Sequence, residues 1–304
     1  MRSWPGPWMR VLVAALVASS LAGSLAGCGQ LDPYRGQRFV VASFYPLQYV
    51  AQRVAGGHAR VLDLTHPGVD PHDLELTVRQ TAEVADSEVA FYEHGLQPAV
   101  DGAVAKTHPA HPVDAAAAAR LVPMTGAEAA AGKDPHFWLD PVRLSRAAAA
   151  FERAMVRADP RHRAAYARNL ASLQRDLHRL DRQLRAGLAH CRLRTIVVSH
   201  NAFGYFARRY HLRSVYINGL SPDAEPSPAH LRQLHDLIGR TGIDTVFSEE
   251  LASPAMADTL AHDLHIKTAV LDPIEGLSNA TAGQDYLSLM RHNLAAIQEA
   301  NHCE

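Results

Sequence analysis

Short apolar runs alternate with amphipathic helical patterns along most of the chain. In the first part, the apolar runs are FVVASFY (39–45), ARVLDL (59–64) and EVAFY (88–92). Helical patterns follow in PLQYVAQRVAGG (46–57) and LELTVRQTAEVADS (74–87). Because this alternation is typical of βα units, it predicts a parallel sheet with helices packed on it.

The middle of the chain has a different pattern. From Arg143 to Ala189 nearly every residue favours a helix, with one interruption at Asp159-Pro160. Proline at this position ends one helix and begins the next. The second helix, from about Arg161 to Ala189, would be about 43 Å long at 1.5 Å per residue, enough to span a whole domain.

The alternation resumes after this helix, with apolar runs at TIVVS (195–199), RSVYI (213–217), DTVFSE (244–249) and KTAVLD (267–272). We therefore predict an α/β fold with two lobes of mainly parallel sheets flanked by helices, joined by one long rigid helix. The expected boundaries are an N-terminal α/β lobe at 38–160, a linking helix at 161–190 and a C-terminal α/β lobe at 191–304.

The N-terminal residues are typical of a secretory signal, because basic residues precede the apolar segment Val11–Ala22. The segment ends in Leu25-Ala26-Gly27-Cys28, which resembles a bacterial lipobox, in which the cysteine is acylated. An ordinary signal peptide that ends near a cysteine is the alternative. We expect a signal peptide at 1–27, lipidation at Cys28 and a lipid-proximal linker at 28–37. The protein would then be extracytoplasmic and lipid-anchored to the bacterial cell membrane.

Charge and cysteine content narrow the possible partners. Thirty basic and 31 acidic residues among 304 leave a net charge of −1, which disfavours nucleic acid as a partner. Of the three cysteines, Cys28 would carry the lipid, which leaves Cys191 and Cys303 as a pair in an oxidising compartment. We predict a disulfide between them, with two free buried thiols as the alternative.

Four side chains at the ends of predicted elements are candidates for metal binding. His200 and Asp272 follow apolar runs of the second lobe, at the carboxyl end of the strands, where ligands collect in open α/β sheets. In the first lobe, His72 follows the run ARVLDL and His136 lies in DPHFWLDP (134–141). Three imidazoles and a carboxylate suit Zn²⁺, whereas a site for Mn²⁺ would contain more carboxylate oxygen.

Other interpretations of these residues stay open. The chain has 18 histidines, and any one of them can be an inert surface or packing residue. His108 and His111 in THPAHP (107–112) are a weaker metal-binding pair. Ser199 precedes His200, but neighbouring residues on a strand face opposite sides, which disfavours a serine hydrolase. A zinc hydrolase would need a general base, for which Glu249 and Glu250 are the candidates.

Six motifs together resemble the cluster A-I solute-binding lipoproteins, which are the metal-binding receptors of bacterial zinc and manganese ABC importers. In chain order, they are FYPLQYVAQRVAGG, HPGVDPHDLELT, DPHFWLDP, SHNAFGYFARRY, GLSPDAEPSP and VLDPIEGL, and the resemblance covers about 38–303. It implies two α/β lobes linked by a rigid long helix, with the metal between them. The matching ligand positions are His72, His136, His200 and Asp272, and the fourth of these varies among zinc members, some of which use water or another carboxylate.

This resemblance implies a function as well. We expect a monomeric receptor, not an enzyme, that binds zinc and delivers it to an ABC permease and its ATPase. Manganese members typically have Glu at the position of His200, so the histidine favours zinc, with manganese as the alternative. Zinc members often carry a long histidine-rich loop, which is reduced here to TGAEAAAGK (125–133). A zinc-dependent hydrolase and a metal-stabilised adhesin are the remaining alternatives.

Overall fold

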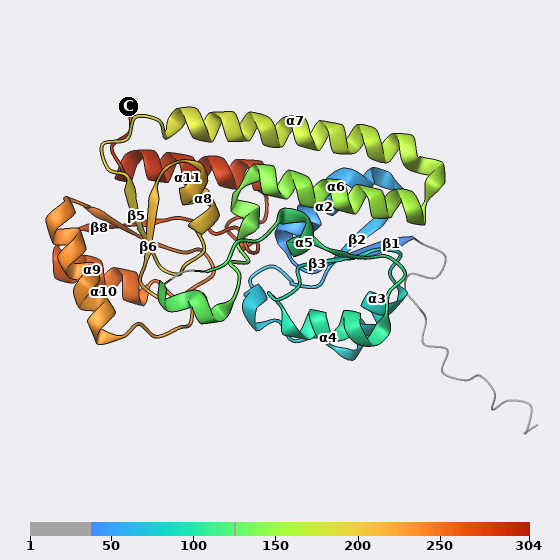
Figure 1. Cartoon of the computed structure of the whole chain (residues 1–304), viewed down its shortest axis with the longest axis horizontal. Coiled ribbons are helices and arrows are strands. Elements are labelled where there is room, and N and C mark those ends of the chain that lie inside the picture. Colours follow the sequence, from blue (N-terminus) through green and yellow to red (C-terminus); the bar gives the residue numbers. More distant parts are fainter. Residues whose placement is uncertain (1–37, 125) are drawn as a thin grey trace, which may run out of the picture. The chain divides into compact units, whose positions relative to one another are not determined.

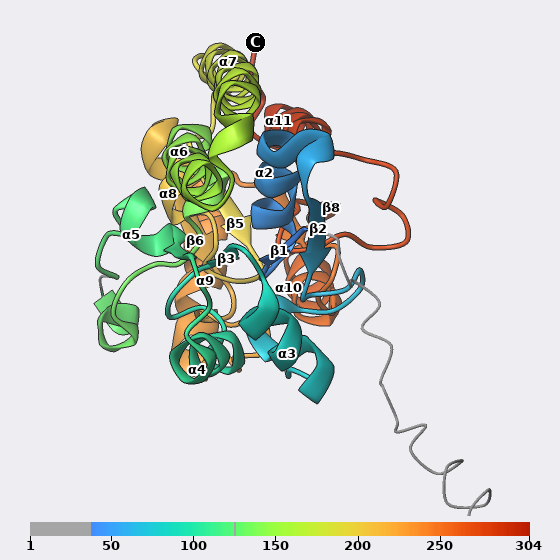
Figure 2. The ribbon, with the colours of Figure 1, turned by 90° about the vertical axis from the view of Figure 1, so that its right-hand side faces the viewer.

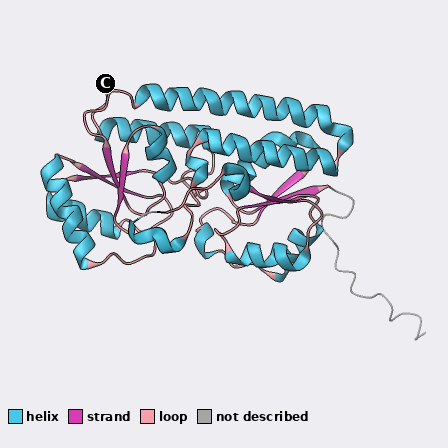
Figure 3. Cartoon of the chain, in the orientation of Figure 1, coloured by secondary structure: helices cyan, strands magenta, loops and turns pink. Residues whose placement is uncertain are grey.

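Two parallel β-sheets organise the structure, a computed structural model that describes residues 38–124 and 126–304 (Figure 3). The first sheet, with strand order β2-β1-β3-β4, consists of β1 (Phe39–Ala42), β2 (Arg60–Asp63), β3 (Ala90–Tyr92) and β4 (Pro112–Asp114). The second, with order β6-β5-β7-β8, consists of β5 (Thr195–Val198), β6 (Arg213–Tyr216), β7 (Thr245–Ser248) and β8 (Lys267–Val270). All these strand pairs are parallel, which confirms the predicted class of fold.

The structure does not describe the N-terminal segment. The predicted signal peptide at 1–27, Cys28 and the linker at 28–37 lie outside the described residues. The residues from Arg38 to Glu304 form a unit of their own. Among the described residues, no helix has both the length and the apolar character needed to span a membrane.

Helices cover both faces of the first sheet (Figure 2). On one side lie α2 (Tyr45–Ala55) and α6 (Pro141–Ala158). On the other side lie α3 (Val78–Asp86) and α4 (Pro98–Thr107). A short helix, α5 (Ala115–Ala119), precedes α6. Local sequence sets where α3 begins: the Thr77 side chain accepts a hydrogen bond from the backbone of Gln80, whose side chain in turn accepts one from the backbone of Thr77. This capping box excludes 74–76 from the helix.

The longest helix is α7 (Arg163–Gly187), which Figure 1 shows beside elements of both lobes. It packs against α2 and α6 of the first lobe and against α11 (Tyr286–Ala300) of the second. The predicted break at Asp159-Pro160 separates it from α6, but α7 begins only at Arg163. The short turn η5 (Pro160–His162) intervenes, and the buried Asp159 carboxylate accepts hydrogen bonds from His162 and Tyr166.

The second sheet carries its own helices. These are α8 (Gly204–Arg209), α9 (Pro228–Thr241), α10 (Ala255–Leu264) and α11. The remaining short 3₁₀ turns of the chain are η1 (Gly56–His58), η2 (Pro71–Asp73), η3 (Gly126–Ala131) and η4 (Phe137–Leu139). A disulfide joins Cys191 to Cys303, which confirms the predicted pair and connects the segment after α7 to the end of the chain.

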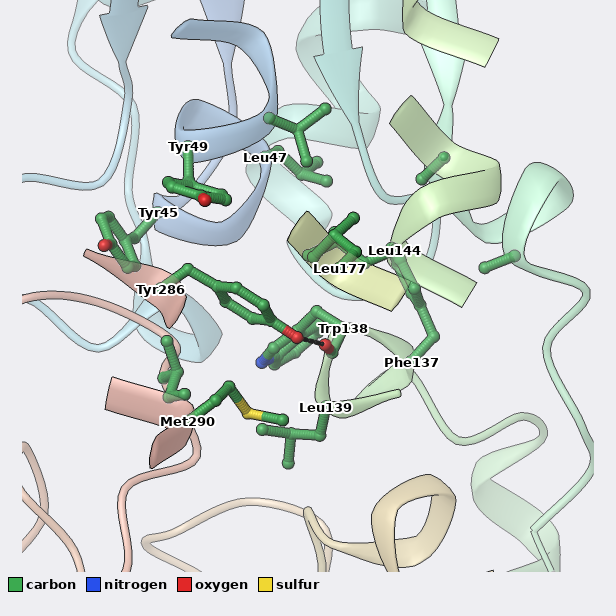
Figure 4. Packing of buried hydrophobic residues seen from close by; sticks show 14 of the residues in the cluster. Tyr45, Leu47, Tyr49, Phe137, Trp138, Leu139, Leu144, Leu177, Tyr286 and Met290 are labelled. Atoms are coloured by element: carbon green, nitrogen blue, oxygen red, sulfur yellow. Dashed lines mark hydrogen bonds between the residues drawn. The ribbon is translucent and has the colours of Figure 1, made fainter. Parts of the chain in front are cut away.

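One cluster of buried hydrophobic side chains extends through both lobes. It includes Phe91 of β3, Leu177 of α7 and Phe247 of β7. At its centre Trp138 and Tyr286 lie against each other, and the Tyr286 hydroxyl donates a hydrogen bond of 2.6 Å to the Trp138 carbonyl (Figure 4). Because the lobes share this packing, their arrangement is fixed by the core as well as by α7.

Candidate metal centre

Four side chains from both lobes converge on one point. They are His72, His136, His200 and Glu275, each of which offers a ligand atom within 4.8 Å of the others. His72 lies in η2 and His136 directly precedes η4, both in the first lobe. His200 follows β5 and Glu275 follows β8, at the carboxyl edge of the second sheet. The structure thus brings together the three histidines that the sequence indicated.

Four of the six distances between the ligand atoms match those of a tetrahedral site. Glu275 Oε1 lies 3.4 Å from His72 Nε2, 3.3 Å from His136 Nε2 and 3.3 Å from His200 Nε2. The Nε2 atoms of His136 and His200 are 3.3 Å apart. Four ligands held tetrahedrally at about 2.0 to 2.1 Å from a zinc ion lie about 3.3 to 3.4 Å from one another. The donor set and these four distances therefore fit a zinc ion, and all four ligand atoms lie within 4.8 Å of one another.

Two further carboxylates orient the imidazoles. Asp134 Oδ1 lies 2.9 Å from His136 Nδ1, and both carboxylate oxygens of Glu249 lie 2.8 Å from His200 Nδ1. A carboxylate accepts hydrogen bonds only, so each holds the proton on Nδ1 and leaves Nε2 free to face the centre. The sequence indicated Glu249 only as a candidate catalytic base. It did not indicate Asp134, although Asp134 directly precedes Pro135-His136.

Burial and mutual charge shift the pKa values of the cluster. Burial alone would lower the pKa of His200, but the charges of Glu275 and Glu249 outweigh it and raise that pKa to about 10. Burial also opposes the charged form of His136, whose pKa is nevertheless raised by hydrogen bonds to Asp134 and Glu275. Despite its own burial, Glu275 has a pKa well below the ordinary value because of His200 and His136. Without metal, the cluster holds a proton at neutral pH.

The loop that carries His72 touches the second lobe. The Asp70 carboxylate accepts a hydrogen bond of 2.8 Å from the His72 backbone N–H and so closes the turn that presents the imidazole. The Gly68 N–H donates one of 2.7 Å to the Leu277 carbonyl, two residues beyond Glu275. His72 is only partly buried, whereas His136 and His200 are inaccessible to solvent. His72 is thus the histidine on the solvent side of the cluster.

The segment that carries His136 is fixed by contacts with the second lobe. Trp138 Nε1–H donates a hydrogen bond of 2.7 Å to the Pro273 carbonyl, and the Tyr205 hydroxyl donates one of 2.7 Å to the Asp134 carbonyl. Gly204 permits this approach, because a Cβ there would lie 2.6 Å from Asp134 Oδ2. These contacts align the first-lobe ligand with those of the second lobe.

Asp272, which the sequence indicated as the fourth ligand, does not belong to the cluster; Glu275 takes that place. Asp272 follows β8, as expected, but its Oδ1 accepts a hydrogen bond of 2.7 Å from the Ile274 N–H. Ile274 has a φ of 57°, a left-handed conformation that turns the chain sharply. The turn brings Glu275 to the histidines, and its carboxylate rather than that of Asp272 meets the imidazoles. Asp272 and Glu275 both lie in VLDPIEGL, shortly after the same strand. The rule that ligands collect at the carboxyl ends of strands therefore does not distinguish between them.

The other candidates from the sequence lie elsewhere. Ser199 Oγ donates a hydrogen bond of 3.1 Å to the Phe247 carbonyl, and Glu250 Oε1 accepts one of 2.6 Å from Ser278. His108 is exposed at the end of α4. Neither it nor His111 joins the cluster, which is the one group of at least three potential metal ligands found among the described residues.

Comparisons with known proteins agree with this geometry. A family model described as "Zinc-uptake complex component A periplasmic" matches residues 40–300. The chain is 31% identical over 299 residues to the zinc-binding lipoprotein AdcA of Streptococcus pneumoniae, a match that covers 91% of this chain and 58% of AdcA. It is 30% identical over 287 residues to the high-affinity zinc uptake system protein ZnuA of Bacillus subtilis, with 90% of each covered.

A solved structure is similar in fold as well. The crystal structure of the Zn(II)-bound ZnuA-like domain of Streptococcus pneumoniae AdcA has a TM-score of 0.75 and 31% sequence identity, and the match covers 88% of this chain and 99% of that domain. The similarity therefore extends over nearly the whole of that domain, although the chain spans only 58% of the length of the AdcA relative.

Proposed function

The chain belongs to the zinc-uptake complex component A family, and from this premise we propose that it is an extracytoplasmic receptor for zinc in ABC import. It captures the ion between its lobes with His72, His136, His200 and Glu275 and delivers it to a membrane permease driven by an ATPase. The observation that carries this proposal is the spacing of 3.3–3.4 Å between Glu275 Oε1 and the three Nε2 atoms. Relatives named as zinc-binding and zinc-uptake proteins support the choice of ion.

The donor set favours zinc over manganese. Three imidazole nitrogens and one carboxylate oxygen provide a closed tetrahedral site, which zinc accepts readily because it has no geometric preference of its own. Manganese is harder and is better served by more oxygen ligands. We expect manganese to bind weakly at the same place.

The same arrangement argues against catalysis. A catalytic zinc site keeps one position open for water, whereas four protein side chains are in place here. Glu249, the candidate base, is engaged with His200 through both carboxylate oxygens. We infer that the ion is bound and released unchanged.

We further propose that the receptor is a monomer, held at the outer face of the cytoplasmic membrane by a lipid on Cys28. The sequence Leu25-Ala26-Gly27-Cys28 supports the anchor, and the Cys191–Cys303 disulfide agrees with an oxidising compartment. For the organisation of the chain, we propose lobes at 38–160 and 191–304 with the linking segment at 161–190 between them.

Calorimetric titration of zinc and manganese into the metal-stripped protein tests the proposal. We expect one tight zinc site per chain and a much weaker manganese response. Glu275→Gln should weaken zinc binding by at least about 100-fold, because it removes the one carboxylate ligand and the negative charge that would face the ion. His111→Gln, a histidine outside the cluster, is the control and should bind like the wild type.

Several weak sites in place of one tight site, or an unchanged affinity in Glu275→Gln, would contradict the receptor assignment. Hydrolytic turnover that disappears on chelation would favour the zinc-hydrolase alternative. Loss of the folded state on chelation, instead of simple emptying of the site, would favour a metal that is retained only for structure.

A further inference from the structure

A small cavity of about 10 Å³, roughly the room that one water molecule needs, adjoins the metal centre. Its wall contains four carboxylates, those of Asp70, Glu249, Asp272 and Glu275. Leu251 and Ala252, which also line it, are half-exposed, whereas Glu275 is 4% exposed. The cavity therefore lies between partly exposed residues and the one carboxylate of the proposed site.

Three of these carboxylates have evident roles. Asp70 caps the turn of His72, Glu249 holds His200, and Glu275 belongs to the ligand cluster. Asp272 differs from them. Its Oδ1 accepts a hydrogen bond from the Ile274 N–H. Its Oδ2 is buried and has no hydrogen-bond partner among the described residues, and the residue as a whole is 8% exposed.

A buried carboxylate oxygen without a partner is costly, so Asp272 calls for a functional reason. Burial, together with the negative charges of Glu250, Glu275 and Glu249, raises its pKa to about 7. A cation that enters the cavity would offset this repulsion and supply the missing partner for Oδ2. Zinc takes carboxylate oxygen at about 2.0 to 2.2 Å, a common ligand distance for this ion.

We propose that Asp272 is a transit residue, which holds the zinc ion briefly in this cavity on its way to and from the three histidines and Glu275. An incoming ion exchanges part of its hydration shell for Asp272 Oδ2 before it reaches Glu275, and a departing ion takes the reverse path. This inference rests on the proposed receptor function. Because such a residue lowers the barrier in both directions, it changes the rates of binding and release and leaves the equilibrium nearly constant.

Stopped-flow measurement of zinc association, and of zinc release to an excess of chelator, tests this role in Asp272→Asn. The Asn side chain keeps an oxygen for the Ile274 N–H and nearly the same volume, but it lacks the charge. We expect both rates to fall by about tenfold, a barrier change of about 1.4 kcal/mol, while Kd changes by less than about threefold. Asp272→Ser, whose hydroxyl can also accept from Ile274, repeats the test, and thermal unfolding verifies the fold of each variant.

The matched control is Glu250→Gln. Glu250 contributes a negative charge near Asp272 but does not line the cavity, and its Oε1 is bound to Ser278. The rates of zinc association and release in this variant should stay within about twofold of the wild type. A single charge that does not line the cavity acts on the ion only through an electrostatic field that salt screens.

The alternative outcomes are distinct. Unchanged rates in Asp272→Asn, or an equal slowing in Glu250→Gln, would overturn the transit role. A loss of affinity beyond about tenfold with unchanged association would also overturn it and make Asp272 a true ligand. If the wild type binds zinc tightly and Glu275→Gln does not, the receptor function stands whatever Asp272→Asn shows. If the wild type lacks a tight site, the proposed function itself fails.

Discussion

The carboxylates around the imidazoles determine how each histidine can act. Asp134 and Glu249 contact Nδ1 of His136 and His200, so the Nε2 atom of each ring faces Glu275. Sequence patterns identify histidines near strand ends but do not specify ring orientation. That information comes from residues as far apart as His200 and Glu249, which only the folded chain brings together.

Replacement of Asp134 should reveal this orienting role. In Asp134→Asn, the amide can donate to Nδ1 of His136, which favours the tautomer with its proton on Nε2, the atom that faces the metal. We expect zinc affinity to fall about 10- to 100-fold, as measured by competition with a fluorescent chelator. The control is Asp101→Asn, because Asp101 lies 3.1 Å from Nδ1 of the exposed His94 and is outside the ligand cluster. An equal effect in both variants would exclude a specific role for Asp134.

The raised pKa of His200 predicts a pH dependence. On ordinary histidine pKa values, zinc affinity would fall only as the pH approached about 6. The charges of Glu275 and Glu249 overcome the effect of burial and raise the pKa of His200 to about 10, so the metal-free site is protonated throughout the neutral range. Zinc must displace this proton, and affinity should rise about tenfold per pH unit between pH 6 and 8.

Calorimetry in buffers of different ionisation enthalpy measures the same effect directly. At least one proton should leave per zinc ion bound at pH 7.5. An affinity that is constant above pH 7, with no proton release, would show that His200 is neutral before the metal arrives. It would then count against the charge pairing with Glu275.

The sequence predicted three of the four converging residues. His200 stands at the carboxyl end of a predicted strand, where ligands collect, and His72 and His136 stand in distinctive settings at the ends of other predicted elements. The fourth could not be assigned in the same way, because Asp272 satisfies the rule equally well. What separates it from Glu275 is the left-handed backbone of Ile274. A β-branched residue rarely adopts that conformation, and nothing in the local sequence indicates it.

The elements themselves follow the hydrophobic pattern closely. The predicted runs TIVVS, RSVYI, DTVFSE and KTAVLD contain β5 to β8, and Asp159-Pro160 separates the two long helices. The short strand β4 (Pro112–Asp114) was not predicted, because proline at its start and only one buried residue give it no apolar run. The start of α7 at Arg163 rather than at 161 reflects the contacts of Asp159, which involve side chains in the following turn.

The disulfide fastens the segment after α7 to the residues that follow α11. Removing it in the double variant Cys191→Ser, Cys303→Ser should lower the free energy of unfolding by about 2 to 5 kcal/mol, measured with guanidinium chloride. Zinc affinity should stay within threefold of the wild type, because neither cysteine belongs to the ligand cluster. The wild type under reducing conditions is the matched comparison and should lose the same stability.

Stability unchanged in both samples would mean that the bond contributes nothing to the fold. A large loss of zinc affinity, on the other hand, would mean that the second lobe depends on this bond for the position of His200.

Over the whole molecule, the shared core limits how far the lobes can move. The cluster that contains Phe91, Leu177 and Phe247 is continuous through both of them. Hydrogen bonds from Trp138 to Pro273 and from Tyr286 to Trp138 join the lobes next to the metal ligands. A long connecting helix could be predicted from the sequence, but the shared core could not, because the hydrogen bonds that join the lobes within it connect residues more than a hundred positions apart.

Zinc capture should therefore require only a small change of shape. Glu275 Oε1 already lies 3.3 to 3.4 Å from the three Nε2 atoms, and α7 packs on helices of both lobes. We therefore expect the radius of gyration, about 19 Å for a compact chain of this length, to stay constant within error when zinc is added. Small-angle X-ray scattering of metal-free and zinc-loaded protein measures this. Trp138→Phe, which loses the bond to Pro273 but keeps an aromatic ring in the core, is the comparison and should compact more on binding than the wild type. A clear compaction of the wild type itself would mean that the lobes open widely without metal, and that selectivity arises from closure instead of from a preformed site.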